Sequence, residues 1–243
     1  MPLPVSQFRS STSRLTSPTS ARYRWASISR AAYGRLHVPD TAQRFASRTL
    51  YLDADTLVIG DIAALAETDF GKAAVVAAVR SRLHPTVRLG GIDDWEQRGL
   101  DPTAPFFNSG VLLIDNDAWT RRDISAQVVT DLRRRPETAS FADQGALNSV
   151  LYDQWSELPW YWNHEIVRTP AVRVGPFVVS RRSYFTYREV RILHYLADLK
   201  PWDARYPPGY LSTVYRRSWE HFLPVPAPQF QSYRQWLRKR YSR

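Results

Sequence analysis

The stretch RTLYLDADTLVIGD, residues 48–61, constrains the fold of this chain more than any other. Its Leu, Tyr, Val and Ile residues lead to Gly60, a pattern typical of a buried strand followed by a turn. Asp53 and Asp55 interrupt this run, and residues two apart on a strand point to the same face. Two buried carboxylates side by side are costly unless a cation lies between them. The stretch therefore predicts a metal site or, alternatively, two strand-end acids that are solvated or paired in salt bridges.

The positive charge of the chain is concentrated in its ends. The net charge is +10, but residues 1–39 hold six Arg and no acid, residues 231–243 hold five Arg or Lys and no acid, and the body from 40 to 230 carries −1. A nucleic-acid groove would have to lie in these ends, so we expect an enzyme with no nucleic-acid partner. No apolar run reaches the roughly 18 residues of a membrane span. The length suits one domain with a large core, which we place in the cytoplasm.

Three regions are expected along the chain. Residues 1–24 are rich in Ser, Thr, Pro and Arg and are predicted to be disordered, or one partial strand and a loop. The domain spans 25–222, and residues 223–243 form a Pro-rich linker and a basic, aromatic tail. Such a tail suits an amphipathic helix on an anionic membrane surface, here the inner face of the membrane, or alternatively a solvated segment.

The elements between these ends alternate between helix and strand. We expect a helix over 28–38 closed by Pro39, an apolar strand over 73–79, a tight turn at 108–110 leading into a strand to 115, a helix capped by Asp123, a helix beginning near 143, and a strand over 190–193 that delivers His194. This order predicts an α/β domain with a largely parallel sheet flanked by helices. Residues 80–105 are predicted to form a long loop, and loops of this length are usually functional or mobile.

Four motifs in fixed order carry a resemblance to a known family. YLDADTLVIGDI, FFNSGVLLID, DQGALN and HYLADLKPW, preceded by SRAAYGRL at 29–36, resemble the family-8 retaining glycosyltransferases of the lipopolysaccharide galactosyltransferase and glycogenin type. The resemblance covers roughly residues 25–205 and implies a GT-A fold with a mixed, largely parallel sheet. It also implies a hexosyltransferase that moves a sugar from a UDP-sugar to a saccharide or glycolipid acceptor.

The residues themselves suggest how such a site would bind a metal. A hard divalent ion such as Mn²⁺, or Mg²⁺, takes carboxylate oxygens and tolerates one imidazole, so Asp53, Asp55 and His194 form the expected ligand set. The ion would neutralise charge on a departing diphosphate. Lys200 would stabilise the same charge from a second side, as both a donor-binding and a catalytic residue.

The resemblance assigns four further residues to the donor sugar. Arg35, Asn108 and Asp143 would contact its hydroxyls, and Gln144 would lie on its reactive face near the anomeric carbon. Since no carboxylate is clearly placed as a nucleophile, we favour front-face displacement, in which the leaving and entering groups share one side of the sugar. The acceptor is expected at the loop 80–105 and the aromatic stretch 155–162, for which core packing is an equal alternative.

Two departures from the family pattern are visible. Ala197 stands where the family usually has Gly, which would crowd the diphosphate or remove a positive-φ option. No counterpart precedes the metal strand for the family's first strand and the helix and strand after it, so we expect an N-terminally truncated domain. Its segment Leu50–Ile59 would then expose an apolar edge, and binding of UDP would be weak.

Two other functions fit part of the sequence. Tyr51–Val58 also resembles the Asp-x-Asp-x-Thr motif of haloacid-dehalogenase-type phosphatases. However, Lys72 and the acidic pair at 93–94 follow too closely for that fold, and the segments 108–110 and 194–202 are left unexplained. The second alternative is a glycosyltransferase remnant that binds no donor. Metal-dependent binding of UDP separates all three functions.

Overall fold

The computed structural model describes residues 30–71, 74–134, 142–166, 173–174, 177–178, 188–197, 199–203, 205–206 and 209–222. The predictions for segment 1–24 and tail 223–243 lie outside these residues. Among the described residues, no helix combines the length and the apolar character needed to cross a membrane.

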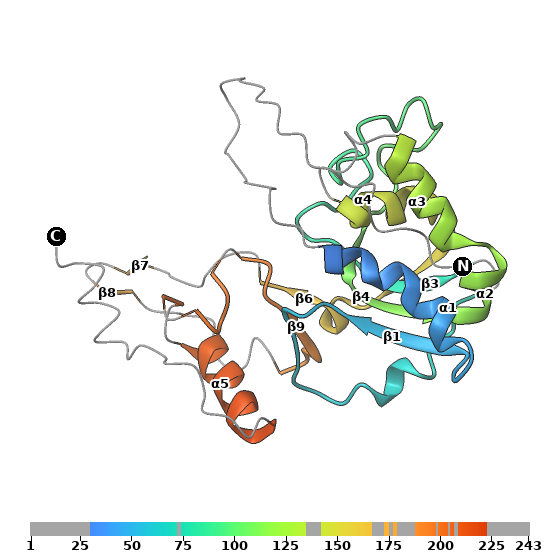
Figure 1. Ribbon diagram of the computed structural model, residues 1–243. Coiled ribbons are helices and arrows are strands. Elements are labelled where there is room, and N and C mark those ends of the chain that lie inside the picture. Colours follow the sequence, from blue (N-terminus) through green and yellow to red (C-terminus); the bar gives the residue numbers. More distant parts are fainter. Residues whose placement is uncertain are drawn as a thin grey trace.

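A four-stranded sheet forms the centre of the fold (Figure 1). Its order is β1 (Arg48–Leu52), β4 (Phe107–Asp115), β3 (Val76–Arg80) and β5 (Trp155–Leu158). Strand β4 is antiparallel to both of its neighbours, and β5 runs parallel to β3. All of β4 except Asp115 is buried, including the polar Asn108 and Ser109.

A three-stranded sheet adjoins the first one. It has the order β2 (Thr56–Val58), β9 (Ile192–His194) and β6 (His164–Glu165), with β2 antiparallel and β6 parallel to β9. A short antiparallel ribbon follows from β7 (Arg173–Val174) and β8 (Phe177–Val178). Most of the pairings among described strands are antiparallel, so the expected α/β class with a mixed sheet holds, whereas the expectation of a largely parallel sheet is wrong.

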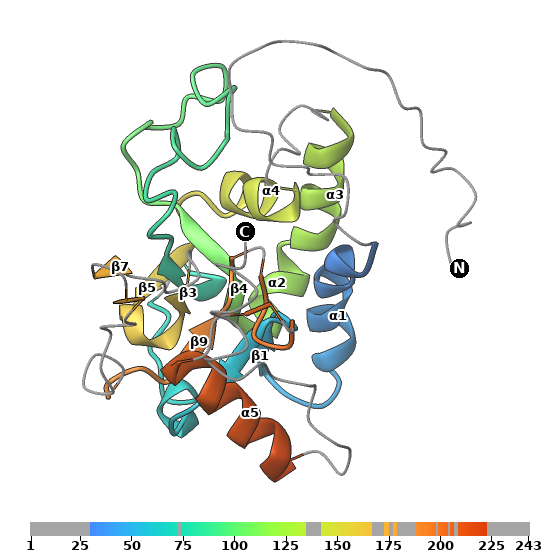
Figure 2. The same cartoon turned by 90° about the vertical axis from the view of Figure 1, so that its left-hand side faces the viewer.

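Helices cover both faces of the central sheet. One face packs against η2 (Arg30–His37), α1 (Val38–Ala42), α2 (Asn116–Arg121), α3 (Ile124–Arg134) and α4 (Ala142–Val150). The 3₁₀ turns η3 (Ala63–Leu65) and η5 (Trp160–Trp162) cover the other, and α5 (Tyr210–Phe222) packs near the second sheet. Figure 2 shows α1, α3 and α4 on the side of the strands away from α5.

The alternation of side chains along the strands explains these two cores. Val76 and Ala78 of β3 belong to the core under the helices, whereas Ala77 and Val79 belong to the core on the opposite face. Trp119 of α2 is the largest side chain buried in the first core, at 1% exposure. Burying a large apolar side chain of this kind stabilises the fold by roughly 1.5–3 kcal/mol.

Two local predictions were wrong. Pro39 does not close a helix; it occupies the first turn of α1, where a missing N–H costs nothing. Residues 108–110 do not form a tight turn, because all three lie in β4. Helix α2, capped by the Asp115 carboxylate through Ala118 N at 2.7 Å, was not anticipated.

Strand β1 is an edge strand among the described strands. Its odd-numbered residues form the hydrogen-bonded pairs with β4. The backbone N–H and C=O groups of Leu50 and Leu52 therefore face away from the sheet. A groove of about 640 Å³ borders this edge, between Leu50, Leu113 and the η3 turn. Strand β2 is also the outer strand of its sheet among the described strands, because β9 is its partner on one side alone.

Candidate metal centre and active site

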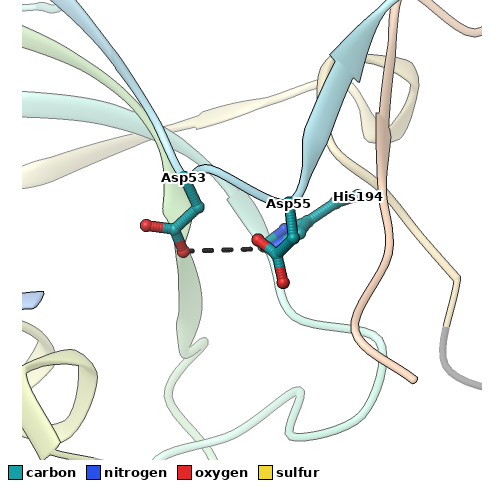
Figure 3. A group of neighbouring side chains, drawn as sticks. All are labelled: Asp53, Asp55 and His194. Atoms are coloured by element: carbon teal, nitrogen blue, oxygen red, sulfur yellow. Dashed lines mark ion pairs between the residues drawn. The ribbon is translucent and has the colours of Figure 1, made fainter. Parts of the chain in front are cut away.

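The two acids lie at the junction of the two sheets. Asp53, Ala54 and Asp55 form a turn between β1 and β2, closed by Thr56, whose N–H and hydroxyl donate to the Asp53 carbonyl at 3.0 and 2.8 Å. The prediction that alternation along one strand aligns the two acids is therefore wrong. The turn, rather than a single strand, brings their carboxylates together (Figure 3).

The pairing of β2 with β9 adds His194 to this pair. Thr56 is opposite His194 in the register, and Tyr195 N donates to the Asp55 carbonyl at 2.9 Å. His194 Nε2 lies 3.2 Å from Asp55 Oδ1 and 3.9 Å from Asp53 Oδ2. One ligand atom from each of the three residues lies within 4.8 Å of the others. The three predicted metal ligands are thus brought together.

The state of His194 shows that the group fits a metal. Its side chain is 2% exposed, and its Nε2 faces the two carboxylates without forming a hydrogen bond of acceptable geometry with any described residue. A buried imidazole nitrogen without a hydrogen bond is costly unless something else occupies its lone pair. Two carboxylates and one imidazole match a hard or borderline divalent ion such as Mn²⁺.

Gly110 makes the approach of His194 possible. A Cβ at this position would lie 2.1 Å from His194 Cε1 and 2.8 Å from Asp53 Oδ2. Sequence reasoning placed Gly110 in a turn and missed this role. A glycine inside a buried strand pattern was the available signal, because it often marks a close approach of other groups to the backbone.

Arg35 contacts the carboxylates of both Asp53 and Asp143. Its Nη2 donates to Asp53 Oδ1 at 2.9 Å, its Nη1 donates to both the carbonyl and the hydroxyl of Ser109 at 2.9 Å, and its Nε lies 2.6 Å from Asp143 Oδ2. The Nε–Asp143 contact is an ion pair without hydrogen-bond geometry. With 7% of its side chain exposed, Arg35 acts as an internal clamp. Its expected contact with the sugar stays a prediction.

Asp143 and Gln144 begin α4 beside this clamp. Burial raises the pKa of Asp143, and the charge of Arg35 offsets part of that rise. Gln144 Oε1 accepts from Ser109 N at 3.0 Å, which fixes the orientation of its side-chain amide. Asp143, Gln144 and Arg35 therefore lie together beside Ser109, as expected for residues of one site.

Lys200 completes the charged groups. Its Nζ donates to Asp55 Oδ2 at 2.7 Å and also to the Tyr195 carbonyl. Burial acts to raise the pKa of Asp55, but His194 and Lys200 more than offset this, and the pKa lies well below its usual range. Ala197 is absent from the described residues with positive φ, so the backbone there does not require glycine.

Two asparagines lie behind the metal group. Asn108 Oδ1 accepts from Gly110 N and from Asn163 Nδ2, each at 2.9 Å, so this oxygen is used inside the protein. Contact of Asn108 with a sugar stays a prediction. Asn163, whose Oδ1 lies 3.0 Å from His194 Nδ1, was not anticipated from the sequence.

Comparison with known proteins gives consistent relatives. The chain is 29% identical over 200 residues to General stress protein A of Bacillus subtilis (strain 168), covering 81% of this chain and 65% of that protein. It is 25% identical over 206 residues to the lipopolysaccharide 1,3-galactosyltransferase of Salmonella typhimurium (strain LT2), covering 79% and 56%. The chain thus spans less than two thirds of the length of these relatives.

A solved structure shares the fold. The galactosyltransferase LgtC in complex with donor and acceptor sugar analogs superimposes with a TM-score of 0.61 at 21% identity, covering 82% of this chain and 69% of that one. The sequence model for glycosyl transferase family 8 matches residues 4–205, which include all four predicted motifs. This chain therefore belongs to glycosyl transferase family 8 and has a GT-A-like α/β fold.

Proposed function

We propose that this chain is a metal-dependent, retaining hexosyltransferase that moves a hexose from a UDP-sugar to a saccharide or glycolipid acceptor. The observation that carries the proposal is the group of Asp53, Asp55 and His194, in which a buried imidazole nitrogen faces two carboxylates without a hydrogen bond, in a member of this family. Family membership also rules against the phosphatase alternative.

The ligand set would hold Mn²⁺ or Mg²⁺, and the bound ion would supply positive charge beside the diphosphate of the donor. Lys200, already 2.7 Å from Asp55 Oδ2, would supply a second positive charge to the departing diphosphate. Because its ammonium bridges Asp55 and the Tyr195 carbonyl, little reorganisation is needed when the donor binds.

Gln144 and Asp143 would position the donor sugar. Gln144 is oriented through Ser109, and Asp143 is held by Arg35, so both side chains are fixed before the substrate arrives. The amide of Gln144 would present a polar, weakly nucleophilic face to the anomeric carbon. This chemistry supports front-face displacement over a covalent intermediate, for which a free carboxylate would be needed.

The acceptor would bind beside the loop 80–105 and Trp160. Trp162 is 7% exposed and belongs to the core, and the ring centroids of Trp155 and Phe107 lie 5.2 Å apart. For these two tryptophans the core-packing alternative therefore holds. Trp160 is 43% exposed and offers an indole face that can stack on a sugar ring. The lipopolysaccharide galactosyltransferase among the relatives supports a saccharide or glycolipid acceptor.

The test is titration calorimetry of UDP with the purified chain, with and without Mn²⁺. We expect binding that needs the ion and that is lost in Asp53→Asn, Asp55→Asn and His194→Gln. Asp203→Asn, which changes a half-buried acid paired with the exposed Arg205, serves as the control and should bind like the wild type. No metal-dependent binding of UDP by the wild type would support the remnant alternative and overturn the proposal.

The basic tail gives the proposal a second part. We propose that residues 229–243 attach the enzyme to anionic membranes, because Phe, Tyr, Trp and Leu alternate there with five Arg or Lys residues. Co-sedimentation with phosphatidylglycerol vesicles should fall when this segment is deleted. Equal co-sedimentation of the full and shortened chains would rule the membrane role out.

A further inference from the structure

A buried pair of asparagine amides connects the metal group to the backbone of β4. Asn163, between η5 and β6, is 1% exposed, and Asn108 on β4 is 4% exposed. Neither position is a metal ligand, yet their amides form a continuous chain of hydrogen bonds that ends at His194. We propose that Asn163 is a positioning residue that sets the tautomer of His194, an inference that rests on the proposed metal-dependent function.

The chain of hydrogen bonds starts at the backbone N–H of Gly110, which can only donate. Gly110 N–H, a backbone donor, points to the side-chain atom of Asn108 that lies 2.9 Å away. Only an acceptor can face a backbone N–H, so this atom is the amide oxygen Oδ1. The backbone of β4 therefore fixes which way the Asn108 amide is turned.

The same logic then fixes Asn163 and His194. The second contact of Asn108 Oδ1, at 2.9 Å, must come from a donor, so it is the Nδ2 of Asn163. The remaining amide atom of Asn163, its Oδ1, lies 3.0 Å from His194 Nδ1 and can only accept. The hydrogen of a neutral His194 is therefore on Nδ1, and Nε2 carries the lone pair.

This tautomer is the one that a metal site requires. Nε2 is the nitrogen that faces Asp55 Oδ1 at 3.2 Å and Asp53 Oδ2 at 3.9 Å. In the other tautomer, a hydrogen on Nε2 would point into the space between these groups and remove the lone pair that an ion needs. That tautomer would leave the bare Nδ1 facing the Asn163 oxygen, two acceptors without a hydrogen between them. Asn163 thus keeps the lone pair of Nε2 and the two carboxylates available for a cation.

Substitution of Asn163 tests this role with two readouts other than activity. Asn163→Leu removes both hydrogen bonds. Asn163→Asp loses the donor to Asn108 Oδ1 but keeps an acceptor for Nδ1–H, so it serves as the conservative variant. Asn116→Leu is the matched control: Asn116 is 0% exposed and bonds the Ala46 carbonyl at 2.8 Å, beyond the opposite end of β4. Asn163→Ala replaces the leucine variant if the latter does not fold.

The first readout is the ¹⁵N NMR spectrum of the metal-free protein labelled at histidine, recorded at alkaline pH and assigned with His194→Gln. Protonated and unprotonated ring nitrogens have distinct shifts, and we expect a protonated Nδ1 and a bare Nε2 in the wild type and in Asn163→Asp. Asn163→Leu should show the other tautomer or a mixture. A wild type with the hydrogen on Nε2, or a leucine variant with the wild-type tautomer, would overturn the inference.

The second readout is the affinity for Mn²⁺, measured by electron paramagnetic resonance of the free ion. Loss of a group that orients a ligand typically weakens a metal site by about 10–100-fold, and we expect this for Asn163→Leu. Asn163→Asp and Asn116→Leu should stay close to the wild type. Equal affinity of the leucine variant and the wild type would reject the role of Asn163, whereas a wild type that binds no Mn²⁺ would reject the proposed function and leave the NMR result to decide the tautomer.

Discussion

Replacing Arg35 by Met should destabilise the protein strongly, because Arg35 is the counter-charge of two acids. The substitution keeps an apolar side chain of similar length but removes the guanidinium that contacts Asp53 at 2.9 Å and Asp143 at 2.6 Å. Of these acids, Asp143 is the more deeply buried, with 6% of its side chain exposed compared with 24% for Asp53. Breaking a buried ion pair by removing one partner typically costs about 3–5 kcal/mol.

The size of this loss can be converted into a melting temperature. In a chain of this length, each kcal/mol lowers the melting temperature by about 2–4 °C. We therefore expect Arg35→Met to melt about 6–20 °C below the wild type. Arg98→Met is a control of the same chemistry, since Arg98 is paired with Asp94 and Asp131 away from the site. It should lose stability but keep the affinity for Mn²⁺ and UDP.

The pH dependence identifies the acid responsible. The pKa of Asp143 is raised in the folded protein, so its contribution to stability is present below the ordinary Asp value and is lost as the pH rises through the folded pKa. Without Arg35 the pKa rises further. The difference in melting temperature between the wild type and Arg35→Met should therefore grow with pH, and circular dichroism melts between about pH 5 and pH 8 would measure it.

A double-mutant cycle provides the decisive comparison. Asp143→Asn removes the uncompensated charge, so in the Arg35→Met background it should restore about 1–3 kcal/mol, whereas in the wild-type background it should destabilise. Urea unfolding of the four proteins gives the coupling. If Asp143→Asn has the same effect in both backgrounds, Arg35 does not act as its counter-charge and the clamp assigned to Arg35 is wrong.

Three further predictions follow from single contacts. Gly110→Ala should abolish binding of Mn²⁺ in titrations, because its Cβ would lie 2.1 Å from His194 Cε1, whereas Gly34→Ala, with no atom within 4 Å, should bind normally. Lys200→Met should weaken binding of UDP by roughly 10–100-fold in calorimetry, the value of one charge-assisted hydrogen bond, and an unchanged affinity would remove Lys200 from the donor site. Phe45→Ser, at an 86% exposed side chain beside the β1 groove, should reduce self-association in light scattering without lowering the melting temperature, and unchanged scattering would show that this groove does not associate.

The sequence predicted which three residues form the candidate metal group, but the prediction of how they meet was wrong. The local signals were a pair of carboxylates after one apolar run and a histidine at the end of another. The structure brings these residues together. The alternation argument was wrong because Asp53-Ala54-Asp55 is a turn between two strands of different sheets. A run of apolar residues shows burial, but it does not show where one strand ends and the next begins.

The direction of the strands and the supporting residues could not be predicted. Apolar periodicity is the same in parallel and antiparallel strands, so the antiparallel position of β4 between β1 and β3 left no signal. Asn163 follows a run of three aromatic residues, and nothing local distinguishes it from a loop asparagine. Its role comes from β6 lying next to β9, a pairing between segments far apart in the chain.

The two acids of the turn have different partners, and this difference connects the metal group to the donor-sugar residues. Asp53 Oδ1 accepts from Arg35 and from the Tyr51 hydroxyl, at 2.9 and 2.7 Å, which leaves its Oδ2 directed at His194. Asp55 Oδ2 accepts from Lys200, and its Oδ1 lies 3.2 Å from His194 Nε2. In each acid one oxygen thus bonds a protein cation and the other faces His194, where an ion would bind.

The charges of the site explain why an ion and an anionic donor would bind together. When ionised, the carboxylates of Asp53, Asp55 and Asp143 exceed the charges of Arg35 and Lys200 by one negative charge. A divalent cation would reverse the sign of this excess and leave one positive charge beside the turn. The diphosphate of a nucleotide-sugar would then meet a positive site only after the ion is in place. The charges of these five residues therefore predict that UDP does not bind measurably without the metal ion and binds once the ion is present.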